Sequence, residues 1–118
     1  MYNIKVEADF SSAHNLRGYK GKCEDLHGHN WKVMVEIEKE TLDKIGMVMD
    51  FKFVKKELNK VLDKLDHKYL NKIPYFKKVN PTSESIAEYI FNLLKKKIPS
   101  LKSVTVWESQ NCRAAYRR

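Results

Sequence analysis

The sequence predicts a single α+β domain. Apolar and polar residues alternate near both ends of the chain, which is the pattern of half-buried β-strands, whereas apolar residues recur at helical spacing in the middle. The length of 118 residues and the hydrophobic fraction of 42% suit one folded domain over residues 1–118. We therefore expect strands at the two ends of the chain and helices between them.

The first two strands are expected in the N-terminal third. Apolar residues alternate from Tyr2 to Phe10, and a loop that contains glycines and charges follows over 15–26. Alternation resumes over 28–40, with apolar positions Trp31, Val33, Val35 and Ile37.

Two helices are expected in the middle of the chain. Asp50 suits the N-cap of a helix that runs to about Leu65. A loop with two prolines follows, and Thr82 or Ser83 suits the N-cap of a second helix, which Pro99 ends.

Two more strands are expected at the C-terminal end. Val104 and Val106 alternate with polar residues, and a turn around Asn111 leads to a strand that ends near Tyr116. The predicted order is β-β-α-α-β-β in two layers. The edges of so small a sheet are exposed, and we expect oligomerisation to cover them.

Composition narrows the classes of function. The formal net charge of +8 can indicate a nucleic-acid surface, solvated Lys-rich helix faces, or attraction of a small polyanionic substrate. Because the lysines recur within the predicted helices, we favour the helix faces. No stretch is apolar enough to span a membrane, and the N-terminus lacks the apolar core of a signal peptide. We expect a cytoplasmic protein in which Cys23 and Cys112 are reduced.

Three histidines lie where they can share a metal ion. His27 and His29 are two residues apart on the second strand, so their side chains point to one face, the face of Trp31. His14 has the parity of the apolar residues in the first strand, and it joins them if that strand continues without a bulge. Three imidazoles with one open position are typical of catalytic zinc. The pattern predicts a zinc ion held by His14, His27 and His29.

Cys23 leaves the type of zinc site open. It precedes His27 by four residues and can supply a thiolate as fourth ligand, which would make the site closed and structural. Alternatively, it stands beside an open zinc site as a base. It can also contact zinc at rest and leave when substrate binds.

Four short motifs resemble those of the 6-pyruvoyl-tetrahydropterin synthase and 6-carboxy-tetrahydropterin synthase (QueD) family. They are CEDLHGHN at 23–30, LDHKYLN at 65–71, NPTSE at 80–84 and WES at 107–109. With the upstream His14, they span nearly the whole chain in the family's order. The spacing Cys-x-x-x-His-Gly-His resembles the QueD branch.

The resemblance implies a fold, an assembly and a reaction. The fold is the tunnelling fold (T-fold), a four-stranded antiparallel sheet with two helices on one face, and the assembly is a hexamer of two stacked trimers. The substrate is 7,8-dihydroneopterin triphosphate. A QueD-type lyase converts it to 6-carboxy-5,6,7,8-tetrahydropterin, releasing acetaldehyde and triphosphate, as a precursor for queuosine.

The resemblance also implies roles for individual residues. Cys23 matches the general base, Asp66 and His67 a proton relay, Glu108 the anchor of the pterin, and Thr82 and Ser83 a pterin-contacting pair. Asp66 and His67 are adjacent, and neighbouring residues usually orient one another poorly. No motif identifies the residues that bind triphosphate, and the candidates by proximity are Lys20, Lys22 and Arg113.

Two other functions are compatible with these residues. One is 6-pyruvoyl-tetrahydropterin synthase, which uses the same substrate without losing side-chain carbons. The other is a non-catalytic nucleic-acid-binding domain with a structural zinc held by Cys23 and the histidines. Basic and aromatic residues do not interleave as a base-stacking surface needs, so we expect a small-molecule substrate and no nucleic acid.

Overall fold

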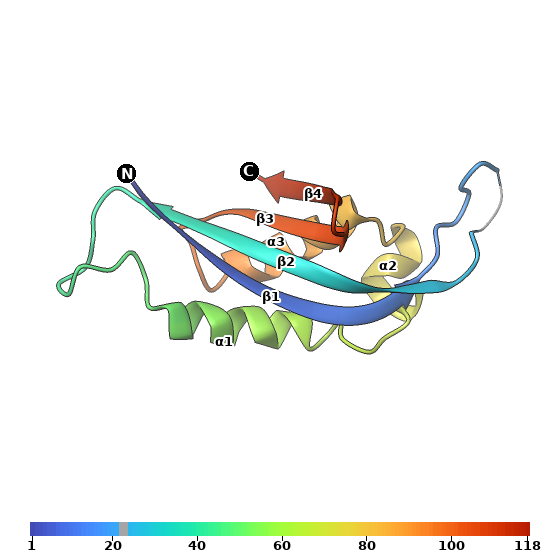
Figure 1. Ribbon diagram of the computed structural model, residues 1–118, viewed down its shortest axis with the longest axis horizontal. Helices are drawn as coiled ribbons and strands as arrows, with labels where there is room; N and C mark the ends of the chain where they lie inside the picture. The colour runs from blue at the N-terminus through green and yellow to red at the C-terminus, as the bar shows by residue number, and fades with distance from the viewer. Residues whose placement is uncertain (22–23) are drawn as a thin grey trace.

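The chain folds into an antiparallel sheet with helices against one face, as the computed structural model shows for residues 1–21 and 24–118 (Figure 1). The strands are β1 (Tyr2–His14), β2 (His27–Lys39), β3 (Leu101–Ser109) and β4 (Cys112–Arg117). The helices are α1 (Phe51–Leu62), the 3₁₀ turn η1 (Leu70–Lys72), the short α2 (Pro74–Lys78) and α3 (Ser83–Lys95).

The sheet has the order β1-β2-β3-β4, and each neighbouring pair is antiparallel. Val6 of β1 pairs with Val35 of β2, which pairs with Val104 of β3, which pairs with Tyr116 of β4. A row of apolar side chains therefore crosses the sheet on the face that the helices cover. This arrangement confirms the predicted order of strands and long helices.

The core lies between that face and the two long helices. α1 packs along β1, and α3 packs on β3 and β4 (Figure 1). The helices bury Val54, Leu58, Ile86 and Ile90, and the strands bury a matching set: Val6, Phe10, Trp31, Val33, Val35, Ile37, Val104 and Val106. Burial of this apolar surface is the main force that holds the layers together.

Both predicted N-caps are present. The Asp50 carboxylate accepts a hydrogen bond from the Lys52 N–H at 2.8 Å, and the Thr82 hydroxyl accepts one from the Ser85 N–H at 3.1 Å. Thr82 rather than Ser83 is the cap, because α3 begins at Ser83. The predicted helix starts are therefore confirmed.

Both long helices end earlier than the sequence pattern predicted. α1 ends at Leu62 and not near Leu65, since the Lys64 N–H donates to the carbonyl three residues back, at 3.1 Å, and the chain tightens into turns. Leu65 is still fully buried, so the apolar pattern continued past the helix. α3 ends at Lys95, before Pro99. In the described part of the chain, no helix is both long and apolar enough to cross a membrane.

The segment 65–69 covers one end of the β1 edge. The Ala13 N–H donates to the Lys68 carbonyl at 3.0 Å, and Ala13 forms a parallel bridge with Tyr69. The sequence predicted only a loop between the helices. Instead, η1 and α2 follow this edge contact, with Pro74 in the first turn of α2, where its missing N–H costs no hydrogen bond.

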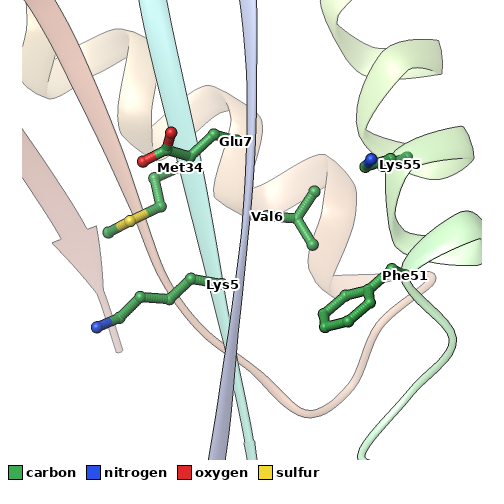
Figure 2. A pocket seen from close by; sticks show the side chains of 6 residues that line it. All are labelled: Lys5, Val6, Glu7, Met34, Phe51 and Lys55. Atoms are coloured by element: carbon green, nitrogen blue, oxygen red, sulfur yellow. The ribbon is translucent and has the colours of Figure 1, made fainter.

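The same edge is open farther along β1, where a hollow of about 450 Å³ lies between β1 and the start of α1. Figure 2 shows that its lining straddles the strand: Val6 and Phe51 lie on the helix side, whereas Lys5, Glu7 and Met34 project from the other side. Unpaired N–H and C=O groups of an edge strand can pair with another chain. This stretch of β1 is therefore suited to contact between copies of the protein.

Candidate metal centre and active site

The strand register brings the predicted metal-binding histidines together. β1 continues without a bulge to His14, which pairs directly with His27 at the start of β2, and His29 follows two residues later. The ring centroid of His14 lies 4.7 Å from that of His27 and 5.2 Å from that of His29. The three imidazoles meet on the core-facing side, beside the buried Trp31.

Backbone carbonyls determine which ring nitrogen carries the hydrogen in His14 and in His27. His14 Nδ1 lies 2.8 Å from the Pro81 carbonyl, and His27 Nδ1 lies 2.8 Å from the Asp25 carbonyl. A carbonyl oxygen can only accept, so both Nδ1 atoms donate. Each neutral ring then presents the lone pair of Nε2, and second-sphere contacts of this kind orient metal-binding histidines.

The distances between the facing nitrogens suit a metal ion. His14 Nε2 and His27 Nε2 are 3.1 Å apart, although neither neutral ring has a hydrogen to donate there. Two lone pairs facing each other at this distance repel one another unless a cation lies between them. Zinc–nitrogen bonds of about 2.0–2.1 Å in a tetrahedron place neighbouring ligands about 3.3 Å apart. The donor set therefore fits zinc.

Glu108 joins the histidines from the end of β3. Its Oε1 lies 3.0 Å from His29 Nε2 and 3.3 Å from His14 Nε2. One ligand atom from each of the four residues lies within 4.8 Å of the other three, so His14, His27, His29 and Glu108 form a group that could hold a metal ion. His29 Nε2 is a buried atom whose close neighbour among the described residues is this carboxylate oxygen.

Burial keeps His29 in the form that binds metals. It lowers the pKa of His29 below its ordinary value, and repulsion from His14 and His27 lowers it further, while Glu108 opposes both effects. A lowered pKa favours the neutral imidazole at pH 7, which is the form that a metal ion requires.

Asp66 and His67 form a contact that their adjacency did not predict. His67 has a φ of +54°, in the left-handed region, and this turn places its Nδ1 3.0 Å from Asp66 Oδ2. The backbone of Ser11 holds the pair, because its N–H donates to Asp66 Oδ1 at 2.9 Å and its carbonyl accepts from the His67 N–H at 2.6 Å. The expectation of poor mutual orientation is wrong, because a strained turn secured by β1 orients both side chains.

Ser12 and Asp66 show how this turn is stabilised. The buried Ser12 hydroxyl donates to the Leu65 carbonyl and accepts from the Lys68 N–H at 3.2 Å, so it bridges both sides of the pair. The hydrogen bond from the Ser11 N–H, with the help of His67, lowers the pKa of Asp66 and keeps it ionised.

His67 and His29 border the same space. An open hollow of about 380 Å³ is lined by His29 and His67, together with residues of β1, β2 and the turn: Ser11, Ser12, Ala13, Gly28, Asn30 and Lys68. A small molecule bound there would lie next to His29 and His67.

Thr82 and Ser83 follow directly after Pro81, which contacts one of the metal-binding histidines. Pro81 accepts the His14 hydrogen bond, and Thr82 caps the helix one residue later. Arg113 lies elsewhere: its guanidinium is 5.5 Å from the ring of Trp107, on the face of the sheet opposite Glu108. Lys20 lies in the loop after β1 with a φ of +51°. Lys22 and Cys23 lie outside the described residues, so their predicted roles stay predictions.

Two asparagines hold the start of the loop that follows β1, and sequence reasoning missed them. Asn71 accepts from the Asn15 N–H at 3.0 Å and donates to its carbonyl at 2.7 Å. Asn80 makes the same pair of bonds with the backbone of Arg17, both at 2.9 Å. Each side-chain amide makes the pair of backbone hydrogen bonds that a neighbouring strand would otherwise make. In the sequence, these two asparagines could have been noticed because each lies at one end of its motif.

Fold and site together define a T-fold protein with a histidine–glutamate group suited to a metal ion. The chain belongs to the 6-pyruvoyl tetrahydropterin synthase family, whose model matches residues 3–118. A 6-carboxy-5,6,7,8-tetrahydropterin synthase of Synechocystis is 38% identical over 98% of this chain and 93% of its own. A dihydroneopterin monophosphate aldolase of Pyrococcus furiosus is 39% identical over 89% of this chain and 88% of its own.

A solved structure supports the fold. The 6-pyruvoyl tetrahydropterin synthase of Caenorhabditis elegans superposes with a TM-score of 0.88 at 31% identity, over 99% of this chain and 95% of that chain. The predicted family and T-fold are thereby confirmed. The relatives carry names of more than one reaction, so the family defines a pterin-metabolising enzyme and does not specify its product.

Proposed function

We propose that the chain converts 7,8-dihydroneopterin triphosphate and water to 6-carboxy-5,6,7,8-tetrahydropterin, acetaldehyde and triphosphate, with zinc held by His14, His27 and His29. The observation that carries the proposal is the convergence of the three Nε2 atoms, two of them fixed by carbonyl contacts, in a chain of this family. The Cys-x-x-x-His-Gly-His spacing and the Synechocystis relative favour the carboxy product.

Zinc at this position would supply Lewis acidity that favours loss of protons from the side-chain hydroxyls of the substrate. The chain supplies the groups that move those protons. Cys23 is the proposed base, since a thiolate is favoured beside positive charge.

Asp66 prepares His67 for proton transfer. Its ionised carboxylate lies against His67 Nδ1 and holds the hydrogen there, which leaves the Nε2 lone pair free to accept a proton from the substrate. The His67 side chain is 82% exposed, so it can reach a molecule in the hollow that it borders with His29.

The remaining contacts recognise the two ends of the substrate. We propose that Glu108 accepts paired hydrogen bonds from the pterin ring and that Thr82 and Ser83 contact the same ring. Lys20, Lys22 and Arg113 stay the candidates for triphosphate, in line with the net charge of +8.

We also propose a cytoplasmic homohexamer, built as a dimer of trimers from one domain per chain. The open stretch of the β1 edge between β1 and α1 supports this assembly, because pairing with a neighbouring copy would satisfy its backbone groups. Size-exclusion chromatography with light scattering measures it, and a monomer at micromolar concentration would contradict it.

Product analysis separates the candidate reactions. With dihydroneopterin triphosphate as substrate, mass spectrometry is expected to find carboxytetrahydropterin and trapped acetaldehyde. A pterin that keeps every side-chain carbon would instead identify pyruvoyl synthase activity, and cleavage of dihydroneopterin monophosphate would favour the aldolase activity named for the Pyrococcus relative. Salt-sensitive binding to nucleic acid without turnover would favour the non-catalytic alternative.

A further inference from the structure

We propose that Glu108 is the fourth ligand of the zinc centre before substrate binds, and that it leaves the zinc to hold the pterin ring when substrate enters. This inference rests on the proposed function and adds an exchange of ligands to it. The carboxylate that would anchor the substrate is in contact with the metal-binding histidines in the substrate-free chain.

The strand geometry directs Glu108 to this position. The register that pairs Val33 with Val106 and Lys32 with Trp107 brings Glu108 level with the β2 residues beside His29. The pairing of β3 with β4 shifts register between Trp107 and Ser109, so Glu108 is the extra residue of a β-bulge. A bulge redirects the side chain of its extra residue, and bulges often adjoin active sites.

The distances match a four-ligand centre. Glu108 Oε1 lies 3.0 Å from His29 Nε2 and 3.3 Å from His14 Nε2, and His14 Nε2 lies 3.1 Å from His27 Nε2. Neighbouring ligands of a tetrahedral zinc are about 3.3 Å apart. A carboxylate also offsets half of the charge of a divalent ion that neutral imidazoles leave uncompensated. Glu108 therefore occupies the position that a catalytic centre must free for substrate.

Exposure indicates which ligand can leave. The His14 side chain is 2% exposed and hydrogen-bonded to the Pro81 carbonyl, so it is fixed. His27 and Glu108 are similarly exposed, at 35% and 37%, but a hydrogen bond to the Asp25 carbonyl holds the His27 ring in place. The pterin ring edge offers parallel N–H donors, to which a carboxylate binds as it does to a guanidinium. Binding of the ring would thus draw Glu108 away and open the coordination position in one event.

Zinc titration of Glu108→Gln tests the first half of the proposal. Loss of outer contacts to a metal ligand typically weakens binding about 10- to 100-fold, so loss of a ligand is expected to weaken zinc binding at least about tenfold. Glu24→Gln is the matched control, because Glu24 Oε1 lies 3.9 Å from Nδ1 of His27, on the side away from the converging nitrogens. We expect the zinc affinity of this control to stay within about twofold of the parent chain. Equal zinc affinities of the two variants would overturn the proposal.

Cobalt spectroscopy tests the exchange and identifies the fourth ligand. The cobalt-loaded parent chain is expected to lack a sulfur-to-cobalt charge-transfer band, and neopterin, as an unreactive probe, should shift its visible spectrum toward that of Glu108→Gln. A sulfur band that Cys23→Ala abolishes would overturn the assignment. So would an unchanged spectrum when equilibrium dialysis shows neopterin bound.

Two further variants keep the test decisive. Circular dichroism of the metal-free chains shows whether Glu108→Gln folds like the parent chain. If it does not, Glu108→Asp replaces it, because aspartate keeps the charge with a shorter reach. A zinc affinity of Glu108→Asp equal to that of the parent chain would count against direct ligation. His29→Asn is expected to lose zinc binding. If His29→Asn binds zinc as the parent does, the metal centre of the proposed function fails; if only Glu108→Gln does, the ligand exchange alone fails.

Discussion

Removal of the Ser12 hydroxyl should loosen the turn that carries Asp66 and His67. In Ser12→Ala, the Leu65 carbonyl loses a donor and the Lys68 N–H loses an acceptor. Leaving a buried polar group unpaired costs about 1–3 kcal/mol, and the exposed position of Lys68 lets water replace part of its bond. We therefore expect a loss of about 1–2 kcal/mol of unfolding free energy, with a lower kcat if Asp66 and His67 act as proposed, because both side chains are less well held.

Denaturant unfolding of the metal-free chain at a fixed protein concentration measures this effect. Ser11→Ala is the matched control, because Ser11 holds Asp66 and His67 through its backbone, which alanine retains. Within the described residues its hydroxyl donates to the exposed Asn30, and its loss should cost less than about 0.5 kcal/mol. If Ser12→Ala were no less stable than Ser11→Ala, the account of how the turn is held would be refuted.

Three further changes have defined outcomes. The pKa of Asp66 is lower in the folded state than in the unfolded state, so its carboxylate stabilises the fold above the unfolded pKa of about 3.9. This stabilisation is lost as pH falls through the folded pKa. The difference in unfolding free energy between the parent chain and Asp66→Asn should therefore shrink over this acidic range when unfolding is measured at several pH values. Thr82→Ala should lower stability by about 1 kcal/mol in thermal unfolding, and Thr82→Ser should restore it, since the serine hydroxyl also caps α3. Asn71→Ala should remove both bonds to Asn15 and speed hydrogen exchange of the Asn15 amide, whereas an unchanged exchange rate would show that Asn71 does not hold the loop.

Alternation of apolar residues predicted much of the fold because the sheet has one buried face. The same parity predicted that His14, His27 and His29 meet, since the direction of a strand side chain depends only on its position and on the absence of a bulge. The same rule does not extend to Glu108, because a β-bulge near the end of β3 sets the direction of its side chain.

The features that the sequence could not predict depend on contacts distant in the chain. The left-handed turn at His67 exists because β1 supplies hydrogen bonds from Ser11 and Ser12, more than fifty residues away. The predicted end of α1 was too late because Leu65 is buried within a turn, and a buried turn residue has the same apolar signature as a helix residue. A pattern of neighbouring residues contains no information on hydrogen-bond partners that lie far away in the sequence.

Turnover of 7,8-dihydroneopterin triphosphate by zinc-loaded and chelator-treated protein tests the central claim most directly. The zinc-loaded chain is expected to release 6-carboxytetrahydropterin and acetaldehyde, the metal-free chain to release neither, and added zinc to restore the reaction. A chain shown metal-free by elemental analysis that turns over at the zinc-loaded rate, or a zinc-loaded chain that leaves the pterin unchanged, would contradict the account.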